Sequence, residues 1–289
     1  MPTPKDYIFR SGSCRKGDLY QLIIDELIKA GWKDVASNPA EEYNVMTSTG
    51  VNDDKELVIQ LRPYYPGTIS LTTNVITTDN TIASLRLQTS YIPGEPGVSG
   101  VFGRPTLTYT SLYLAPSILN TKIHIDVILN YKVYADKNRI ILGIEYPVAL
   151  GYSPVLFYLG QPDTVWMSES KSAGCVYAIS SGPTANLSLL ICDFPDGMAS
   201  SANPYSIPTK VFLPLKNPNN GNRYTMSNII YESTTEGMRG KLDGILCVTN
   251  SNILTGDRLI ENGKTYYVLN CHFYGNSSFP SQAIAVRIE

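Results

Sequence analysis

Residues 254–271, LTGDRLIENGKTYYVLNC, contain an Asn-Gly pair between two runs of strand-forming residues, 258–260 and 265–269. A type I′ turn requires positive φ at both central residues, and Asn262-Gly263 is the kind of dipeptide that adopts it most readily. We therefore predict a β-hairpin here. No nucleophile with an adjacent base lies nearby in the sequence, so the stretch indicates architecture rather than a reactive site.

The composition extends this character to the whole chain. Tyrosine occurs 20 times against 7 Phe and 2 Trp, and charged residues make up only 17% of the 289 residues, below the usual quarter. Such a composition is typical of a β-rich protein with many short strands. Tyrosine also suits large protein–protein contacts. Because tyrosine favours strands in any case, both interpretations stay open.

One amphipathic helix is predicted near the N-terminus, over LYQLIIDELIKAGW. Asp18 can cap its start, and Gly31 suits the position just after its end. Trp32 can fold back onto it. Its apolar residues recur at helical spacing: Leu19, Leu22, Ile23, Leu27 and Ile28. This face must pack on something, and we expect an antiparallel sheet.

The remaining chain reads as strands, so the expected fold class is mainly β (α+β). Within the run 122–134, Ile123, Ile125, Val127 and Leu129 share one face, and residues 135–138 read as a turn. We place a domain boundary near residues 161–163, which gives domains 1–163 and 164–289. The predicted strands are 56–62, 84–91, 122–134, 139–146, 154–159, 175–180, 187–192, 211–215, 244–248 and 282–288.

Charge and cysteine usage exclude several classes of function. The formal net charge is −2 and no Lys/Arg cluster occurs, so we expect no direct nucleic-acid binding. No apolar run reaches the roughly 20 residues of a membrane span, and the N-terminus lacks an apolar signal core. We therefore expect folding in a cytoplasm. The 5 cysteines are scattered, which predicts free thiols rather than disulfides or zinc sites.

Catalytic patterns are absent from the sequence, so we predict a protein that is not an enzyme and binds no cofactor. His124 and Asp126 share a strand face but have no serine or cysteine partner, and His272 next to Cys271 would point to the opposite face. Residues 151–155 lack the second glycine of a nucleophile elbow. A hydrolase built from carboxylates far apart in the chain stays a minor alternative.

Five stretches carry a pattern that spans most of the chain: SGSCRKGDLYQLIIDELIKAGW, ELVIQLRPY, NRIILGIEYPVALGYSPVLFYLGQPDTVW, EGMRGKLDGILCVTNSNILTGDRLIENGKTYYVLN and SSFPSQAIAVRIE. Together they resemble the minor structural proteins of tailed bacteriophages and Firmicutes prophages, which are often found among tail, neck or baseplate genes. The ending GD-x-x-x-x-NGK-x-YYV … AIAVRIE is similar to a small β-module at the ends of virion proteins, and implies a second all-β portion ending in a β-barrel or sandwich-like module.

The resemblance implies a non-enzymatic virion protein that assembles in symmetric copies through loops and sheet edges, with itself and other virion proteins as partners. Two loops, 92–104 and 195–208, mix backbone breakers with apolar residues, and we interpret them as contact arms; ordinary surface loops are the alternative. The candidate contact residues are Val98, Val101, Phe102, Met198, Tyr205 and Ile207.

A second hypothesis is a receptor- or glycan-binding adsorption module at the tail tip. Aromatic rings stack on sugar faces, and Trp166 is the candidate residue for such stacking. Trp32 is assigned instead to the core, because it follows the amphipathic helix. A host surface glycan would then be a further partner.

Overall fold

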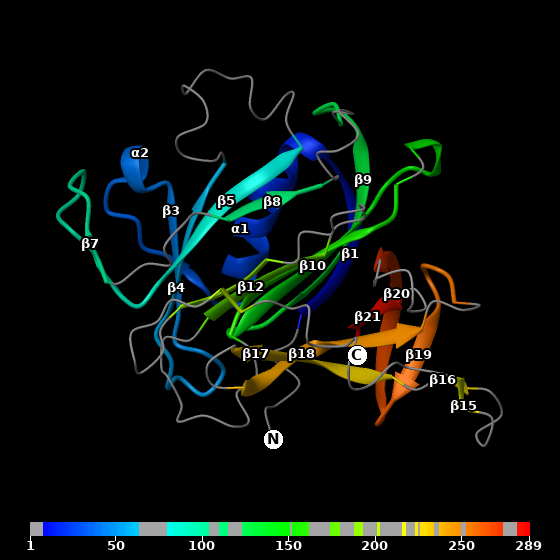
Figure 1. Ribbon diagram of the computed structural model, residues 1–289. Coiled ribbons are helices and arrows are strands. Elements are labelled where there is room, and N and C mark those ends of the chain that lie inside the picture. Colours follow the sequence, from blue (N-terminus) through cyan, green and yellow to red (C-terminus); the bar gives the residue numbers. More distant parts are fainter. Residues whose placement is uncertain are drawn as a thin grey trace.

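The computed structural model describes residues 8–63, 80–103, 110–114, 123–150, 152–161, 174–179, 188–192, 201–202, 216–217, 223–224, 226–233, 237–249, 253–273 and 282–289. In these residues the protein is mainly β, with antiparallel sheets and one longer helix, α1 (Figure 1). The predicted fold class is confirmed at this level.

The largest sheet has seven strands in the order β1-β9-β10-β11-β12-β13-β14. Because β12, β13 and β14 extend it, its hydrogen bonding continues past residues 161–163, where the sequence places a domain boundary. The division into 1–163 and 164–289 stays a prediction. The strands are β1 (Ile8–Arg15), β9 (Ile128–Ala135), β10 (Arg139–Glu145), β11 (Val155–Gly160), β12 (Gly174–Ile179), β13 (Ser188–Cys192) and β14 (Ser201–Ala202).

A five-stranded sheet, β2-β3-β4-β5-β8, forms the other side of the N-terminal core. Its strands are β2 (Lys33–Asp34), β3 (Asn44–Ser48), β4 (Leu57–Arg62), β5 (Thr81–Gln88) and β8 (Thr110–Tyr113). The smaller elements are η2 (Lys16–Asp18), α2 (Pro39–Glu42), β6 (Tyr91–Ile92), β7 (Val101–Phe102), η4 (Val148–Leu150), β15 (Lys216–Asn217) and β16 (Arg223–Tyr224). The strand predicted at 211–215 lies outside the described residues.

Helix α1 (Leu19–Lys29) packs against both sheets rather than one. Leu19, Ile23 and Leu27 are almost fully buried, as their helical spacing predicts. The predicted face is wrong at Ile28, which is 48% exposed, and Ile24 is buried in its stead. The same hydrophobic core takes residues from both sheets, including Met46, Ile59, Leu61, Leu85, Leu129, Val133, Leu142 and Phe157. The buried face of the helix therefore contributes to a core that both sheets share.

The predicted end of α1 at Gly31 is confirmed, whereas the predicted cap at Asp18 is wrong. At the C-terminal end Gly31 has φ 95°, and the Trp32 amide donates to the Leu27 carbonyl at 3.0 Å, which is a Schellman closure. Trp32 is buried and its Nε1 donates to the Asp136 carbonyl. At the N-terminal end Asp18 makes no side-chain cap. Its carboxylate instead binds the Arg15 guanidinium at 3.0 Å, and this pairing lowers its pKa.

The strand predicted over 122–134 is wrong in its first half. Residues 123–127 form a turn, in which the Val127 amide donates to the His124 carbonyl at 3.1 Å, and β9 begins only at Ile128. Contacts with distant residues hold this turn, since the Lys16 ammonium donates to the Ile123 carbonyl at 2.8 Å and the Gly17 amide donates to the Ile125 carbonyl at 3.0 Å. Long-range hydrogen bonds therefore override the local apolar alternation.

The Asn262-Gly263 hairpin is confirmed. β19 (Arg258–Glu261) and β20 (Lys264–Phe273) pair in register with Glu261 opposite Lys264. Both turn residues have positive φ, 51° and 73°. The hairpin belongs to a C-terminal sheet with β17 (Ser227–Ser233), β18 (Gly237–Thr249) and β21 (Gln282–Arg287), in the order β17-β18-β21-β20-β19. In the described part of the chain this sheet is open, with β17 and β19 as its edges.

The C-terminal sheet packs against β10 of the seven-stranded sheet (Figure 1). Gly143 leaves the space that the Leu269 side chain fills. The Arg139 guanidinium is buried and reaches the Asp243 carboxylate at 3.4 Å, and the Tyr267 hydroxyl donates to Glu145 at 2.9 Å. The C-terminal sheet is thus fixed to the N-terminal core by both apolar and polar contacts.

Candidate functional site

A short hairpin projects from the N-terminal core, and we call residues 91–102 the arm. Its two strands, β6 and β7, pair Tyr91 with Phe102 and Ile92 with Val101. Figure 1 shows β7 at the left edge, away from the large sheets. The arm corresponds to the loop 92–104 that the sequence singles out. The last described residue of that loop is Gly103.

The end of the arm is a tight turn over residues 95–98. The Val98 amide donates to the Glu95 carbonyl at 2.8 Å, and Gly97 has φ 85°. Proline at the second position and a glycine with positive φ at the third are the features of a type II turn. The sequence Glu-Pro-Gly-Val thus encodes a defined turn.

The buried carboxylate of Glu42, which ends helix α2, anchors the arm. It accepts hydrogen bonds from the amide of Gly100 at 2.6 Å and from the hydroxyl of Tyr91 at 2.9 Å. It also accepts from the amide of Asn38 at 2.8 Å and from the hydroxyl of Ser37 at 3.4 Å. One side chain thus joins α2, the preceding loop and both halves of the arm.

These hydrogen bonds act on the ionisation of Glu42. Burial opposes the charged form, but the donors from Asn38, Gly100, Tyr91 and Ser37 outweigh it and lower the pKa of the carboxyl below its ordinary value. Glu42 therefore carries its charge at neutral pH, and the donors around it satisfy that charge.

Further contacts fix the arm to its base. The Gly97 amide donates to the Ser37 carbonyl at 2.8 Å, and the Gly94 amide donates to the Ser37 hydroxyl at 3.0 Å. The rings of Tyr91 and Phe102 lie 4.8 Å apart and pack on Val45 and Val58. The arm is therefore held at its base and along its loop.

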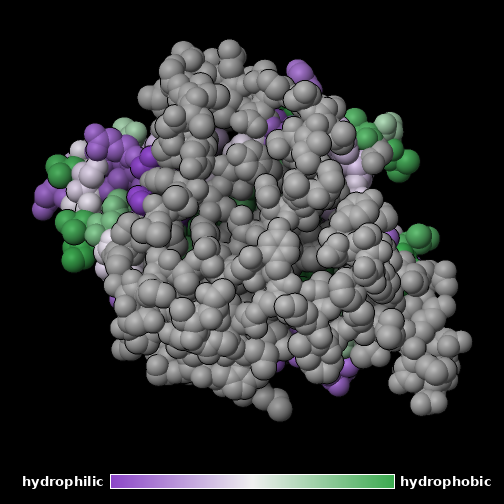
Figure 2. Space-filling model, in the orientation of Figure 1, coloured by the Kyte–Doolittle hydropathy of each residue, from purple (hydrophilic) through white to green (hydrophobic). Residues whose placement is uncertain are grey.

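The outer surface of the arm carries several exposed apolar side chains among polar ones. Ile92, Val98 and Val101 are exposed by 66%, 59% and 66%. Figure 2 shows hydrophobic and hydrophilic residues side by side at the left edge of the molecule, where Figure 1 places β7. Scattered single apolar residues are ordinary on a surface. A rigid hairpin with several of them on it is a surface suited to contact with another molecule.

The structure divides the predicted contact residues into groups. Val98 and Val101 lie on the exposed surface of the arm, whereas Phe102 packs inward against Tyr91. Ile92 belongs to the exposed set as well. It is an apolar residue of the same loop, 92–104, so the sequence offered it on the same grounds as Val98. Met198, Tyr205, Ile207 and Trp166 lie outside the described residues.

A second exposed apolar surface, which the sequence analysis missed, lies at the end of the seven-stranded sheet. Val148 is 97% exposed, and Ile128 and Leu150 are 53% and 36% exposed. We call these residues the tip. Figure 1 places this end of β9 at the upper right, away from β7. The signal in the sequence is the run Pro-Val-Ala-Leu between two strands, where polar turn residues are usual.

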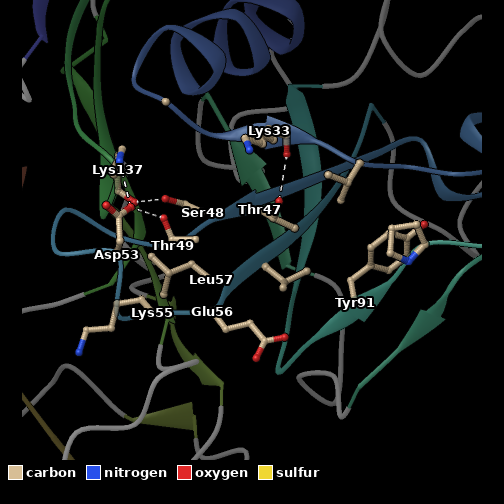
Figure 3. Close-up of a pocket in the computed structure, with 14 residues that line it drawn as sticks. Lys33, Thr47, Ser48, Thr49, Asp53, Lys55, Glu56, Leu57, Tyr91 and Lys137 are labelled. Carbon is tan, nitrogen blue, oxygen red and sulfur yellow. Dashed lines mark hydrogen bonds and ion pairs between the residues drawn. The ribbon is translucent and has the colours of Figure 1, made fainter.

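A groove of about 470 Å³ lies beside the base of the arm. Figure 3 shows Lys137 and Asp53 at one end and Tyr91 at the other, with Lys33 and Thr47 between them. At the polar end the Lys137 ammonium lies 3.1 Å from the Asp53 carboxylate. Hydrogen bonds from Thr49 and from Lys137 lower the pKa of Asp53. The groove thus has a charged end at Lys137 and Asp53 and a less polar end at Tyr91, where the arm begins.

The remaining candidates for chemistry do not form a catalytic site in the described residues. His124 Nδ1 lies 3.4 Å from the Asp126 carboxylate, but both side chains are more than 60% exposed. Burial raises the pKa of Cys14 to about 11 and of Cys247 to about 12, which makes both thiols poor nucleophiles. Among the described side chains no group of His, Cys, Asp and Glu is arranged to hold a metal ion.

The described helices include none that is long and apolar enough to cross a membrane. The sequence matches no protein-family model, and no curated protein sequence is significantly similar to it. Fold and site together define a β-rich protein with a braced apolar arm and an adjoining groove.

Proposed function

We propose that this protein is a non-enzymatic structural component of a tailed-phage particle, at the tail, neck or baseplate. It assembles in several symmetric copies, and the arm is a principal contact. The observation that carries the proposal is the combination of an exposed apolar surface on the arm with the buried Glu42 that fixes it.

Rigidity is the reason to interpret the arm as a contact surface. A flexible loop loses conformational entropy when it binds, whereas a braced hairpin has already lost it. Exposed apolar side chains on such a hairpin gain free energy when a partner removes them from water. Assembly through the arm would therefore gain the burial of Ile92, Val98 and Val101 without the cost of ordering them.

Other features support a role in a particle. The net charge of −2 allows close packing of copies without strong repulsion. The resemblance to virion structural proteins spans most of the chain and ends in the C-terminal β segment. The described residues of that segment form a five-stranded open sheet, which supports its all-β character. We propose the virion as the location, after folding in the host cytoplasm, with other virion proteins as further partners.

Immunogold labelling of particles from the source culture tests the proposal. We expect label at the neck, tail or baseplate. Label confined to the distal tip would favour the alternative, a receptor- or glycan-binding adsorption module. Absence of label on intact and gently disrupted particles would contradict both.

A pair of variants tests whether the arm is what holds the protein in the particle. Ile92→Ser with Val101→Ser removes the apolar surface of the arm, and Leu254→Ser is the matched control, because Leu254 is 70% exposed, belongs to no sheet edge and lies far along the chain from the arm. We expect the arm variant to be lost from particles and the control to be retained. Equal retention of the two would show that the arm does not hold the protein in the particle.

A further inference from the structure

We propose that the arm of one copy docks in the groove of a second copy of this chain. This rests on the proposed function, since it names the surface that the arm contacts during self-assembly. The arm would place Glu95 against Lys33 and Val98 against the apolar end of the groove.

The groove offers an exposed cation, Lys33. Lys33 is exposed at the rim, and among the described residues its ammonium is in no ion pair. The two other lysines of the groove differ, because Lys137 lies 3.1 Å from Asp53 and Lys55 lies 3.2 Å from Asp54. An incoming carboxylate would therefore be attracted mainly to Lys33.

The arm offers the complementary group. Glu95 is exposed in the turn at the end of the arm, and within the described residues its carboxylate is in no ion pair. Val98, at the other end of the same turn, is 59% exposed. The groove has Val35 and Val58 beside Lys33. The groove also holds the carboxylates of Asp53 and Glu56, so Glu95 would pair with Lys33 itself while Val98 meets the apolar residues.

The arm cannot fill the groove of its own chain in the observed conformation. Tyr91 and Pro93 line the groove, but the turn at 95–98 does not. Hydrogen bonds from Gly94, Gly97 and Gly100 to Ser37 and Glu42 hold that turn in place. A turn 95–98 that enters this groove would therefore belong to a second copy.

The placement of the two surfaces makes the contact reciprocal. Because the groove begins at the base of the arm (Figure 3), the arm and the groove form one continuous surface. A two-fold arrangement can then seat both arms in both grooves at once. The charge pairing would set the register of the two copies, and the apolar contacts would supply most of the affinity.

Charge reversal in trans tests the docking. The variants Glu95→Lys and Lys33→Glu are purified separately, and self-association of each is compared with the wild type by sedimentation velocity. Each reversal sets like charges against each other, and we expect it to weaken association roughly tenfold or more. In an equimolar mixture, a pair of unlike variants has the two reversed charges facing each other at one contact and the native Glu95 and Lys33 at the other. Both contacts then join opposite charges, so association should return to near the wild-type level.

Arg258→Glu is the control, because it reverses an exposed charge on β19, away from the groove, and we expect it to associate as the wild type does. If the wild type associates and the two single variants associate equally well, docking in the groove is overturned while self-assembly stands. A mixture that fails to recover would show that Glu95 and Lys33 do not face each other. A wild type that stays monomeric at all concentrations would overturn self-assembly itself.

Discussion

The two hairpins of this protein are built by different means. The β19–β20 hairpin is closed by its own turn, since Asn262 and Gly263 adopt the positive φ values that their types allow. The arm also has a suitable turn at 95–98, but its position depends on Glu42, which lies 58 residues before Gly100 in the chain. A hairpin can thus be fixed by local conformation or by a remote acceptor, and only the first is readable from sequence.

The largest expected effect comes from Glu42→Gln, which removes the charge that the arm's donors surround. The Gln amide nitrogen would replace one of the two carboxylate oxygens and cannot accept a hydrogen bond. It would face either the Gly100 amide or the Tyr91 hydroxyl and Asn38 amide, and those buried donors would lose their acceptor. We expect a loss of about 2–4 kcal/mol in the free energy of unfolding. Urea denaturation measures the loss, and hydrogen exchange should show faster exchange across residues 91–102.

Glu41→Gln is the matched control. Glu41 is the neighbouring carboxylate, is exposed, and accepts from the Ser99 hydroxyl at 2.8 Å. We expect a change within about 0.5 kcal/mol, as for most surface substitutions. If the Glu42 and Glu41 variants were equally stable, the arm would not depend on the buried carboxylate, and the contrast between the hairpins would fail.

The pH dependence of stability sharpens the same contrast. The pKa of Glu42 is lowered in the folded protein, so the folded state binds this proton less readily than the unfolded state. Its contribution is therefore fully present above the ordinary pKa of about 4.3 and is lost as the pH falls through the lower folded value. The pKa values of Asp18 and Asp53 are also lowered, so the wild type alone does not isolate Glu42.

The comparison is therefore made between the wild type and Glu42→Gln across pH. The difference in their unfolding free energies should be constant from pH 7 to about pH 5 and should shrink below that, because Glu42 becomes protonated in the wild type. Urea midpoints at each pH measure it. A difference that does not change with pH would mean that the charge of Glu42 contributes nothing and only its shape matters.

Much of the fold follows from local signals, and the arm shows where they end. The apolar spacing of α1, the Gly31 closure and the Asn262-Gly263 turn all depend on neighbouring residues. The structure confirms the closure, the turn and the helix, but the buried face of the helix includes Ile24 and leaves out Ile28. The backbone breakers around Val98 and Val101 were enough to single out the loop. They could not reveal that Glu42 anchors it, because nothing in the sequence links a glutamate in a four-residue helix to an amide at residue 100.

The failed strand over 122–134 has the same cause. Its apolar alternation is regular, yet residues 124–127 form a turn, and the buried Lys16 donates to the Ile123 carbonyl just before it. The tip was missed for a different reason, since the run at 147–150 falls between two predicted strands and its sequence does not show that Val148 is exposed. In each case a contact, or its lack, between distant parts of the chain decides the result.

A smaller effect is expected when the two turns are altered in parallel. Gly97→Ala and Gly263→Ala both add a Cβ at a positive φ, and neither new atom meets a neighbour within 4 Å. Each should therefore lose about 1 kcal/mol through backbone strain alone. Thermal unfolding of the two variants provides the measurement.

The local consequences should differ between the two hairpins. Hydrogen exchange near residues 258–269 should rise in Gly263→Ala, because that turn is the hairpin's own closure. Exchange at Tyr91 and Gly100 should stay slow in Gly97→Ala, since Glu42 holds both. Similar loosening of both hairpins would show that the arm relies on its turn as much as on its anchor.

The smallest effect on stability is expected from Val98→Ser with Val101→Ser. Both side chains are more than half exposed, so the folded monomer gains little from them, and the free energy of unfolding should change by less than about 0.5 kcal/mol. Self-association should nevertheless fall, because the contact of the arm with its partner would lose two apolar groups. Urea denaturation of dilute monomer and sedimentation of concentrated protein separate the two quantities. A large loss of monomer stability would mean that these valines support the fold of the arm, whereas unchanged association would mean that its apolar surface is not a contact. With the expected result, Glu42 fixes the shape of the arm and the two valines meet the partner.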